Sequence, residues 1–472
     1  MDAWVSARRA AGIRPSALRR LGFAAGLAGV LGIVSGCTGA APAQGVAFEL
    51  VLSVSEAIPT VFTATWTVDA AERNESWLEV GRDGTWELRV DGVPGDDGYS
   101  AWLLGLKPET AYDVRPATSV DGAIVTGEPI SITTGGRPPT LPEVAIEGES
   151  LSSGGFVVTS MVASPSAAVI LDGDGDYVWW HVFDDPEYLI SSVELSTDRR
   201  WMLVLLERPG GFCHGFARVR LDGAVEEIQL LDDAHHDFAE LGEGATALLR
   251  WDNRTIDADI VRGDRISELG ADGSLTDVWS LWDQREPDPA LIGGELGDWG
   301  HSNHLVLGGD GESYYVSIRN LSAILKIDRA TGGIAWQLGG DEGSLAFPDG
   351  EKPFIHQHGF DLTESGLVLF DNGDELAGTS RVVEIAIDEE HGTAEVVWTH
   401  AAEPPQFCYA LGDVQRLPAG NTLVAWSVLG RIEEVTPDHE MLWRADLSMG
   451  GGVGYVTWLE SLYPAVDAGS GD

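Results

Sequence analysis

The sequence is poor in cationic residues, and this deficit limits what the protein can bind. Lysine and arginine together number 29 against 75 aspartates and glutamates, so the formal net charge is -46 at pH 7. A field of this sign repels nucleic acid and anionic membrane surfaces, which argues against nucleic-acid binding. It also opposes anionic small molecules, so an anion site must be locally positive, with histidines or arginines converging in a pocket.

The chain also lacks an apolar run long enough to span a bilayer comfortably, and its N-terminal run fits an export signal instead. Five arginines accompany the apolar residues 21–34, and Val34-Ser35-Gly36-Cys37 looks like a bacterial lipobox. We therefore expect a lipoprotein signal peptide over residues 1–37, lipidation of Cys37, and a polar tether over residues 38–45. The protein is then lipid-anchored to the cell envelope, at the outer membrane, in the periplasm or at the cell surface.

Cysteine is scarce, since only Cys213 and Cys408 remain after processing. In an oxidising compartment an even pair favours a disulfide, here between elements about 195 residues apart in the sequence. Two free buried thiols are the alternative.

Short alternating runs indicate a small β domain at the start of the exported chain. Residues 62–67, 86–90 and 130–133 alternate apolar and polar side chains, as half-buried strands do. The segment from Leu106 to Tyr112 resembles the tyrosine corner of fibronectin type III domains, with Trp66 as a core tryptophan. We expect a fibronectin type III-like β-sandwich over residues 46–136, and a Gly- and Pro-rich linker over residues 137–150.

Beyond residue 150 a tight turn followed by a short strand recurs about every fifty residues. The six copies end at Trp180, Ile228, Trp279, Trp336, Trp398 and Trp443. Four short strands per unit, repeated six times, is the pattern of a β-propeller. The sequence thus predicts an all-β protein, a six-bladed β-propeller over residues 151–465 preceded by a small β-sandwich, with a tail at 466–472. A pair of unrelated β-sandwiches is the alternative.

Histidines concentrate where the repeats begin. Six of the eleven fall in three segments: Ala234-His235-His236-Asp237, Trp299-Gly300-His301-Ser302-Asn303-His304 and Ile355-His356-Gln357-His358. Because the first strand of each blade lines the central channel, we expect these segments to meet around its axis. A strand over residues 356–362 places both of its histidines on one face. The predicted site is a funnel with imidazoles, guanidiniums and Asp or Asn at its rim, built from His235, His236, Asp237, His301, Asn303, Arg319, His356, His358, Asn372 and Arg381.

Two groups of side chains suggest metal sites as alternatives. His356 and His358, with His236, Asp237 or His301, offer enough nitrogen and oxygen ligands for zinc or a similar ion. No short signature such as His-Glu-x-x-His supports this, so we do not favour a metal. The run Asp172-Gly173-Asp174-Gly175-Asp176 suggests calcium, but it lacks the later Gly and Glu of an EF-hand, which favours a hairpin turn.

Over residues 150–465 these motifs, in this order and spacing, resemble the bacterial arylsulfotransferase family, which uses aryl sulfates and needs no nucleotide sulfate. The matching segments are His235-His236-Asp237, Asp298-Trp299-Gly300-His301-Ser302-Asn303, Ser317-Ile318-Arg319 with Trp336-Gln337-Leu338-Gly339-Gly340, Gln357-His358 with Phe370-Asp371-Asn372-Gly373 and Ser380-Arg381-Val382-Val383-Glu384, and Gly412-Asp413-Val414-Gln415-Arg416-Leu417 with Gly420-Asn421-Thr422-Leu423.

The resemblance implies transfer of a sulfuryl group from a phenolic sulfate to another phenol through a sulfated histidine, with no cofactor. By motif, His236 and His358 contact the sulfate and phenolate oxygens, and Arg381 or Arg319 supplies positive charge. The partners implied are a small aryl sulfate and a phenol.

The sequence departs from the family pattern in two places. The arginine that closely follows the Asp-Asn-Gly segment in the family is replaced by Asp374-Glu375-Leu376, and Arg381 comes later. The nucleophilic histidine lies in the last part of the propeller, but here no histidine stands between His400 and His439, and Ser427 occupies the corresponding region. Two interpretations explain the missing histidine. Either another channel histidine takes its role, or the chain is a non-catalytic propeller that binds a ligand or protein partner.

Overall fold

The computed structural model describes residues 46–464, except 70–74, 153, 184, 186, 209–211, 257–258, 288–296, 351, 377 and 449–450. The expected signal peptide (1–37) with Cys37, the tether (38–45) and the tail (466–472) lie outside the described residues. The described chain is built of strands and four short 3-10 helices, η1 to η4. Within it, no helix combines the length and the apolar character needed to cross a membrane.

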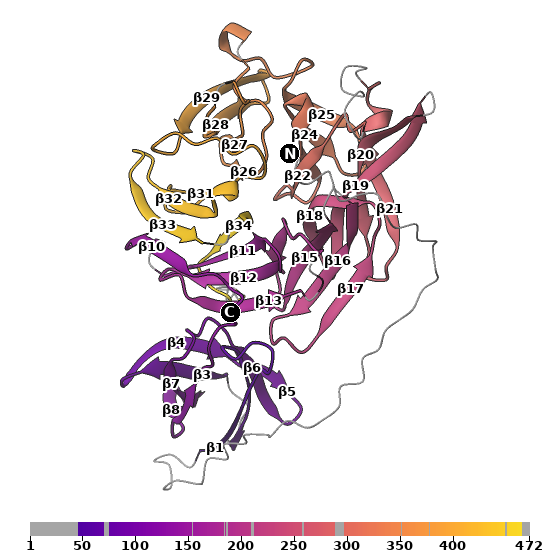
Figure 1. Ribbon diagram of the computed structural model, residues 1–472. Helices are drawn as coiled ribbons and strands as arrows, with labels where there is room; N and C mark the ends of the chain where they lie inside the picture. Colours follow the sequence, from indigo (N-terminus) through magenta and orange to yellow (C-terminus); the bar gives the residue numbers. More distant parts are fainter. Residues whose placement is uncertain are drawn as a thin grey trace.

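Two antiparallel sheets that share one core make up the N-terminal domain (Figure 1). The first has the order β1-β2-β6-β5, from β1 (Ala47–Val54), β2 (Phe62–Asp69), β5 (Val93–Gly95) and β6 (Gly98–Leu103). The second has the order β4-β3-β7-β8 with β9 beside β7, from β3 (Ser76–Arg82), β4 (Thr85–Asp91), β7 (Ala111–Val120), β8 (Ala123–Thr126) and β9 (Ile130–Thr133). In β2 the alternation of side chains buries Phe62, Ala64 and Trp66 between the sheets. The Tyr112 hydroxyl accepts the backbone N–H of Lys107 at 3.0 Å, as expected for a tyrosine corner.

Six further antiparallel sheets follow, arranged around a common centre in Figure 1. From the innermost strand outward they are β34 (Gly452–Leu459), β11 (Phe156–Val162), β12 (Ala167–Asp172), β13 (Tyr177–Val182); β14 (Val193–Leu195), β15 (Trp201–Arg208), β16 (Phe212–Arg220), β17 (Glu226–Leu230); β18 (Ala234–Gly242), β19 (Ala245–Ile256), β20 (Asp259–Leu269), β21 (Leu275–Ser280); β22 (Ser302–Leu307), β23 (Ser313–Ile318), β24 (Ala323–Asp328), β25 (Ile334–Gly339); β26 (Phe360–Thr363), β27 (Gly366–Asp371), β28 (Arg381–Asp388), β29 (Thr393–His400); and β30 (Asp413–Arg416), β31 (Thr422–Trp426), β32 (Arg431–Val435), β33 (Met441–Leu447). The 3-10 helices are η1 (Leu281–Asp283), η2 (Arg319–Leu321), η3 (Pro348–Gly350) and η4 (Ser427–Leu429).

Strand pairing joins the start and the end of this six-sheet region. The C-terminal strand β34 pairs with β11, so the first sheet combines the start and the end of the region. Strand β10 (Val144–Gly148) pairs with β33 at the outer edge of the sixth sheet. These residues belong to the segment that we expected to be a linker, so that part of the prediction is wrong. Their apolar Val144 and Ile146 pack on the core beside β33, which is what makes a strand of them.

The recurring strands predicted from the sequence are the fourth strands from the centre in the six sheets, β13, β17, β21, β25, β29 and β33, of which β33 is followed by β10 at the edge. Their tryptophans reach the following sheet. Through their indole N–H groups, Trp179 donates to Leu221 O, Trp336 to Glu389, Trp398 to Pro437 O and Trp443 to Gly173 O. The last of these bonds runs from the sixth sheet to the first. The repeat therefore encodes the contact between neighbouring sheets.

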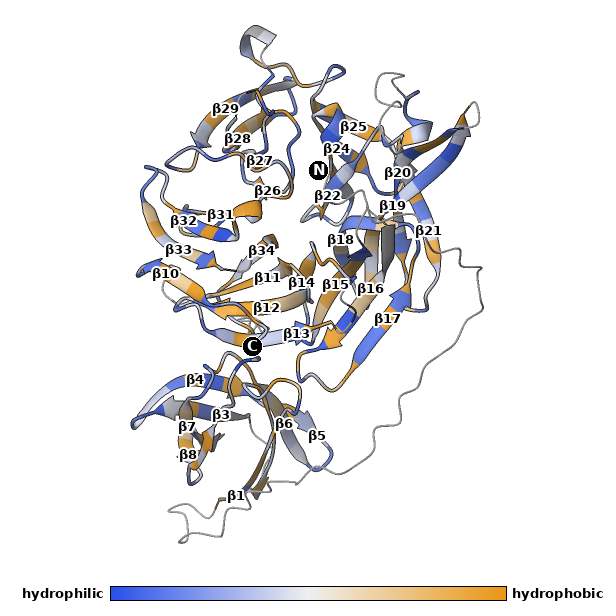
Figure 2. Cartoon of the chain, viewed as in Figure 1, coloured by the Kyte–Doolittle hydropathy of each residue, from blue (hydrophilic) through white to orange (hydrophobic). Residues whose placement is uncertain are grey.

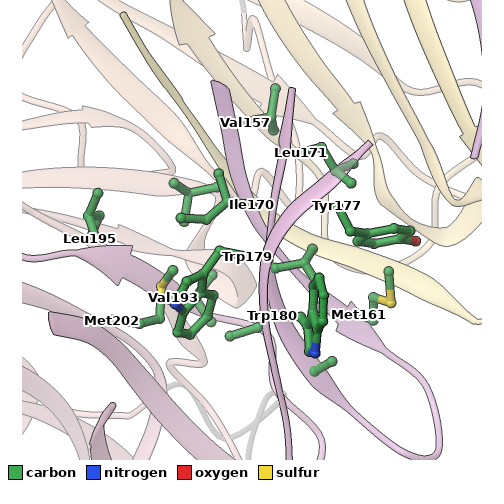
Figure 3. Close-up of a cluster of buried hydrophobic side chains, with 14 of the residues drawn as sticks. Val157, Met161, Ile170, Leu171, Tyr177, Trp179, Trp180, Val193, Leu195 and Met202 are labelled. Carbon is green, nitrogen blue, oxygen red and sulfur yellow. The ribbon is translucent and has the colours of Figure 1, made fainter. Parts of the chain in front are cut away.

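Apolar side chains fill the space between sheets. Figure 3 shows the cluster around the first sheet, where Trp179 lies beside Val193 and Met202 of the second sheet, and Trp180 lies near Met161. Fully burying one such side chain stabilises the fold by about 2–3 kcal/mol. Figure 2 shows hydrophobic colour along β11 and β12, while β17 is largely hydrophilic, since three of its five residues are Glu or Gln.

The turn between β12 and β13 joins the two parts of the molecule. The Lys107 ammonium of the N-terminal domain lies 2.7, 2.7 and 2.8 Å from carboxylate oxygens of Asp172, Asp174 and Asp176. These are the carboxylates that suggested calcium. A hairpin turn is found, as favoured, and a lysine occupies the centre of the three acids.

Candidate functional site

Four inner strands share an unusual backbone conformation at their start, just before β22, β26 and β30 and, in β18, at the irregular pairing between Ala234 and Phe238. His236, His301, His356 and Leu411 have φ angles of 56°, 60°, 55° and 57°, in the left-handed region that residues other than glycine rarely adopt. Strain of this kind costs on the order of 1 kcal/mol per residue and concentrates at functional sites. Since three of the four residues are histidines, equivalent turns of three neighbouring sheets each contribute an imidazole.

The expected strand over residues 356–362 is wrong in its first part, because β26 begins at Phe360. His356 takes the left-handed conformation, and the following side chain, Gln357, donates to Ser317 Oγ and to Ala323 O, both at 2.9 Å. His358 is buried whereas His356 is partly exposed. The two imidazoles therefore do not share a face through strand alternation.

Buried carboxylates hold two of the strained turns. Glu207 Oε1 accepts the backbone N–H of His236 at 2.7 Å, and Asp371 Oδ1 accepts that of Ile355 at 2.9 Å. Sequence reasoning missed Glu207, which lies at the end of an ordinary apolar strand. Its only signal is a carboxylate next to five buried aliphatic positions.

The two predicted asparagines support neighbouring turns. Asn303 Nδ2 donates to Gln357 O at 2.9 Å, while Asn372 Nδ2 donates to Cys408 O at 2.7 Å and to Leu411 O at 2.9 Å. Each asparagine thus links one sheet to the turn of the next. Their amide groups therefore help to hold the turns that border the site.

His236 and His301 form the centre of the cluster. Their ring centroids are 4.6 Å apart, with the rings inclined by 68°. His301 Nδ1 lies 2.7 Å from Asp298 Oδ2, which directs His301 Nε2 away from that carboxylate. On its other side, His236 Nδ1 lies 2.9 Å from Nδ1 of the fully buried His235. The three imidazoles therefore form one connected group.

Burial keeps most of these imidazoles neutral. Desolvation, followed by the positive charge of neighbouring groups, holds the pKa of His236 and of His358 well below 6.5. The pKa of His235 is lowered for the same reasons, and that of His356 is lowered mainly by burial and then by Arg319. Neutral imidazoles present lone pairs, so they can act as nucleophiles or bases.

Two arginines were predicted, and they lie in different surroundings. Arg319 begins η2, donates from Nη1 to Asn320 Oδ1 at 3.0 Å, and makes no ion pair with any described carboxylate. Its charge acts on His236, His356 and His358. Arg381, in contrast, is about half exposed, pairs with Asp371 at 3.0 Å and donates to Pro353 O at 2.8 Å. The guanidinium available to an anion within the cluster is that of Arg319.

A buried ion pair forms the floor of the site. His304 Nδ1 lies 2.7 Å from Asp237 Oδ2, and His304 Nε2 lies 2.9 Å from Phe360 O. Both nitrogens lie near acceptors, an arrangement that favours the imidazolium form. Although burial opposes it, the charge of Asp237 raises the pKa of His304 to about 9. Tyr455 stacks on His304 at 4.8 Å and lies 5.3 Å from His358. The sequence pattern does not single out His304 for the site, because its partners Asp237 and Phe360 come from other sheets.

An acidic cavity of about 320 Å³ lies against the same floor. Its walls include His304 and Tyr455 but none of His236, His301 and His358. Burial raises the pKa of Glu194 to about 8 and that of Asp413 to about 7, both of which line this cavity. The floor thus separates a histidine- and arginine-rich space from an acidic one.

The disulfide favoured from the sequence is not formed. Cys408 is a free thiol at 0 % exposure, among Val368, Phe370, Val382 and Trp426. Its burial raises the thiol pKa to about 12. The side chain of Cys213 lies outside the described residues.

The alternative metal site at the histidines does not assemble in the described part of the chain. There, the one group of three acidic, histidine or cysteine side chains with ligand atoms within 4.8 Å of one another is Asp172, Asp174 and Asp176. A lysine ammonium already lies among them. Among the site's histidines, His301 and His304 direct nitrogens at a carboxylate or a carbonyl, and His235 and His236 direct Nδ1 at each other.

Ser427 stands where the resemblance places the nucleophilic histidine. It opens η4 just as Arg319 opens η2, and it is completely buried. Its hydroxyl accepts the backbone N–H of Gly412 at 3.0 Å. Ser427 therefore supports the turn at Leu411.

Fold and site together define an all-β protein of repeated four-stranded sheets with a histidine- and arginine-lined centre. A family model described as arylsulfotransferase (ASST) matches residues 147–443, and the chain belongs to this family. No curated protein matches its sequence significantly.

Solved structures with a related arrangement are distant in sequence. A protein of unknown function from Bacteroides caccae has 12% identity, covers 66% of this chain and 100% of its own, and has a TM-score of 0.40. A streptogramin B lyase has 12% identity, covers 67% and 98%, and has a TM-score of 0.38. A luciferin-regenerating enzyme has 13% identity, covers 66% and 97%, and has a TM-score of 0.34. These likenesses carry no argument about activity.

Proposed function

We propose that this protein transfers a sulfuryl group from an aryl sulfate to a phenol, at the cluster of His236, His301, His358 and Arg319. The observation that carries the proposal is the convergence, in a chain of the arylsulfotransferase family, of an unneutralised guanidinium with neutral imidazoles. In a protein with a net charge of -46, this local reversal of charge suits an anionic substrate. The donor is a phenolic sulfate, and neither a nucleotide sulfate nor a metal is required.

Each group has a task that its surroundings favour. Arg319 neutralises the sulfate oxygens and the charge that develops on them in the transition state. His301, oriented by Asp298, protonates the departing phenolate oxygen and later accepts the proton of the incoming phenol. His358, above Tyr455, contacts the remaining sulfate or phenolate oxygens. Arg381 stays at the rim, held by Asp371.

The fold and location complete the proposal. The six sheets are the blades of a six-bladed propeller, which β34 closes onto β11. The N-terminal domain is fibronectin type III-like, a reading that the bond between Tyr112 and Lys107 supports. The chain is exported and lipid-anchored through Cys37, with the N-terminal domain between the membrane and the propeller.

The test is the acceptor dependence of nitrophenol release from 4-nitrophenyl sulfate by the purified protein. We expect release that requires a phenol, persists with a chelator, and is lost in His358→Ala and in His236→Asn. Asparagine tolerates the left-handed backbone of position 236 and so preserves the turn. Release that a chelator abolishes would point to a metal enzyme.

Binding without transfer is the second candidate function, and Ser427 favours it because the late histidine of the family is missing. The same assay separates the two. An aryl sulfate that binds to the wild-type protein but is never cleaved identifies a ligand-binding propeller.

A further inference from the structure

Of the four sheets with a left-handed residue at the start of the inner strand, the sixth contributes a leucine instead of a histidine. Leu411 stands at the position that His236, His301 and His356 occupy in the third, fourth and fifth sheets, with a φ of 57°. Histidine, asparagine and aspartate tolerate this conformation better than most residues, whereas leucine is rare in it. A strained leucine at the edge of a site points to a function for its side chain.

Hydrogen bonds hold the backbone on both sides of Leu411. Asn372 Nδ2 donates to Leu411 O at 2.9 Å, and the backbone N–H of Gly412 donates to Ser427 Oγ at 3.0 Å. Leu411 Cδ1 lies 3.6 Å from the point where a side chain of Gly452 would begin, at the start of the innermost strand β34 of the first sheet. The partly exposed leucine side chain therefore extends toward the centre of the six sheets.

Leu411 adjoins the histidine cluster at His358. The backbone of the next residue, Gly412, offers a hydrogen bond to the His358 imidazole, which opposes the lowering of the His358 pKa by burial. Directly after His358, the backbone N–H of Gly359 donates to Gly412 O at 3.0 Å. Strand β34, which Leu411 approaches, also carries Tyr455, whose ring centroid lies 5.3 Å from that of His358. Two separate links therefore place the leucine beside this imidazole.

The short helices of the fourth and sixth sheets differ in the same sense. Helix η2 reads Arg319-Asn320-Leu321 and η4 reads Ser427-Val428-Leu429, so a guanidinium in the fourth sheet corresponds to a buried hydroxyl in the sixth. Leu429, the last residue of η4, is 38% exposed. At this position the sixth sheet therefore offers an anion no charge, and it adds a second apolar side chain.

An aromatic side chain is exposed next to the same turn. Tyr409, two residues before Leu411, is 66% exposed, whereas Trp299 and Phe354, at the same distance before the histidines of the fourth and fifth sheets, are buried. In the sixth sheet Cys408 occupies the buried place among apolar side chains. An exposed tyrosine can pack against an aromatic ligand, because offset or edge-to-face contact between two rings is favourable.

We propose that the sixth sheet binds the aromatic ring of the substrate, and that Leu411, with Leu429 and Tyr409 at the rim, makes the site select aryl sulfates with a large apolar ring system. The inference rests on the proposed function, in which Arg319 holds the sulfate two sheets away. A bicyclic aryl group buries more apolar area against a leucine than a single ring does. Replacing Leu411 should therefore weaken binding more as the aryl group becomes larger.

The experiment measures Kd by calorimetry, without a phenol acceptor, for naphthyl sulfate and 4-nitrophenyl sulfate. We expect the wild type to bind naphthyl sulfate at least about 5-fold more tightly, and Leu411→Asn to reduce this preference to less than about 2-fold. Asparagine is close to leucine in size and tolerates the left-handed backbone, so the turn is kept. Tyr409→Ser, at an exposed position, should lower the preference in the same direction and provides a second variant that does not depend on the turn.

Two controls separate selectivity from general damage. Arg319→Ala should weaken the binding of both esters equally and leave the preference unchanged. Leu230→Asn, at an exposed leucine that ends the outer strand β17, should change neither Kd.

The outcomes distinguish this inference from the proposed function. A wild-type preference that persists in Leu411→Asn and in Tyr409→Ser overturns the inference, and the transfer assay then still decides the proposed function. The expected preferences without transfer to any phenol support the aromatic wall and refute sulfuryl transfer. Failure of the wild type to bind either ester overturns both.

Discussion

The floor of the site makes the stability of the protein depend on pH through one residue, His304. Replacing it with glutamine keeps a donor toward Asp237 but removes the imidazolium. In the folded protein the pKa of His304 is raised from 6.5 to about 9. The stabilisation from the bound proton is therefore fully present below pH 6.5 and is lost as pH rises through 9.

The magnitude follows from the size of this shift. At 1.36 kcal/mol per pKa unit, a rise from 6.5 to about 9 corresponds to about 3 kcal/mol of unfolding free energy. Asp413 acts in the same direction at lower pH, because burial raises its pKa from 3.8 to about 7. Removing the nearby imidazolium would raise the Asp413 pKa further and blur the comparison. The variants are therefore compared in an Asp413→Asn background, which keeps a side-chain oxygen for the Val456 N–H.

The assay is urea unfolding followed by tryptophan fluorescence at a series of pH values. We expect the difference in unfolding free energy between Asp413→Asn and Asp413→Asn/His304→Gln to shrink between pH 6 and about pH 9.5, by less than the wild-type value of about 3 kcal/mol because the Asp413 charge that helps to raise the His304 pKa is absent. Glu194 titrates in both proteins and cancels in the difference. His391→Gln, at a histidine whose side chain is 71% exposed, is the control and should leave the profile unchanged.

A difference that stays constant over this pH range would refute the reasoning, because His304 would then be neutral in the folded protein. Titration of the His304 imidazole by NMR gives an independent reading. A midpoint near 6.5 would contradict the buried ion pair, and a midpoint near 9 would support it.

Three further predictions concern charge and sulfur. Lys107→Met leaves three carboxylates around the space that the ammonium occupied, so we expect the link between the domains to weaken by about 1–2 kcal/mol in thermal unfolding and millimolar Ca²⁺ to restore it. Ca²⁺ should not affect the thermal unfolding of the wild type. The control variant Lys352→Met, in an exposed ion pair, should leave the stability unchanged. Arg319→Ala should lower kcat/KM for aryl sulfate by about 10²–10³-fold. Arg381→Ala should lower it by less than about 10-fold, because Arg381 is already neutralised by Asp371. Equal losses in the two variants would place Arg381 in the site. Cys408 should react with a thiol reagent only after unfolding, and reductant should leave the melting temperature unchanged; a fall in melting temperature would indicate a disulfide.

The sequence by itself determined the class of structure and most of the cluster. The spacing of these strands can be recognised in the sequence because four of the six carry a tryptophan whose indole N–H bonds to the next sheet, so packing imposes the period on the sequence. The concentration of histidines at the starts of the repeats can also be recognised in the sequence, because equivalent segments of neighbouring sheets converge on one site. The same motifs lie within residues 147–443, which the arylsulfotransferase family model matches.

Only the tertiary structure decided what each residue of the cluster does. A strand at His356 was the natural expectation from alternation, yet the left-handed turn arises from contacts of Gln357 with another sheet. The choice between Arg319 and Arg381 depends on Asp371, and the charge of His304 depends on Asp237, one sheet away. Whether an ionisable side chain is neutral, charged or committed to a partner is set by burial and by neighbours distant in sequence, and local sequence patterns carry no record of either.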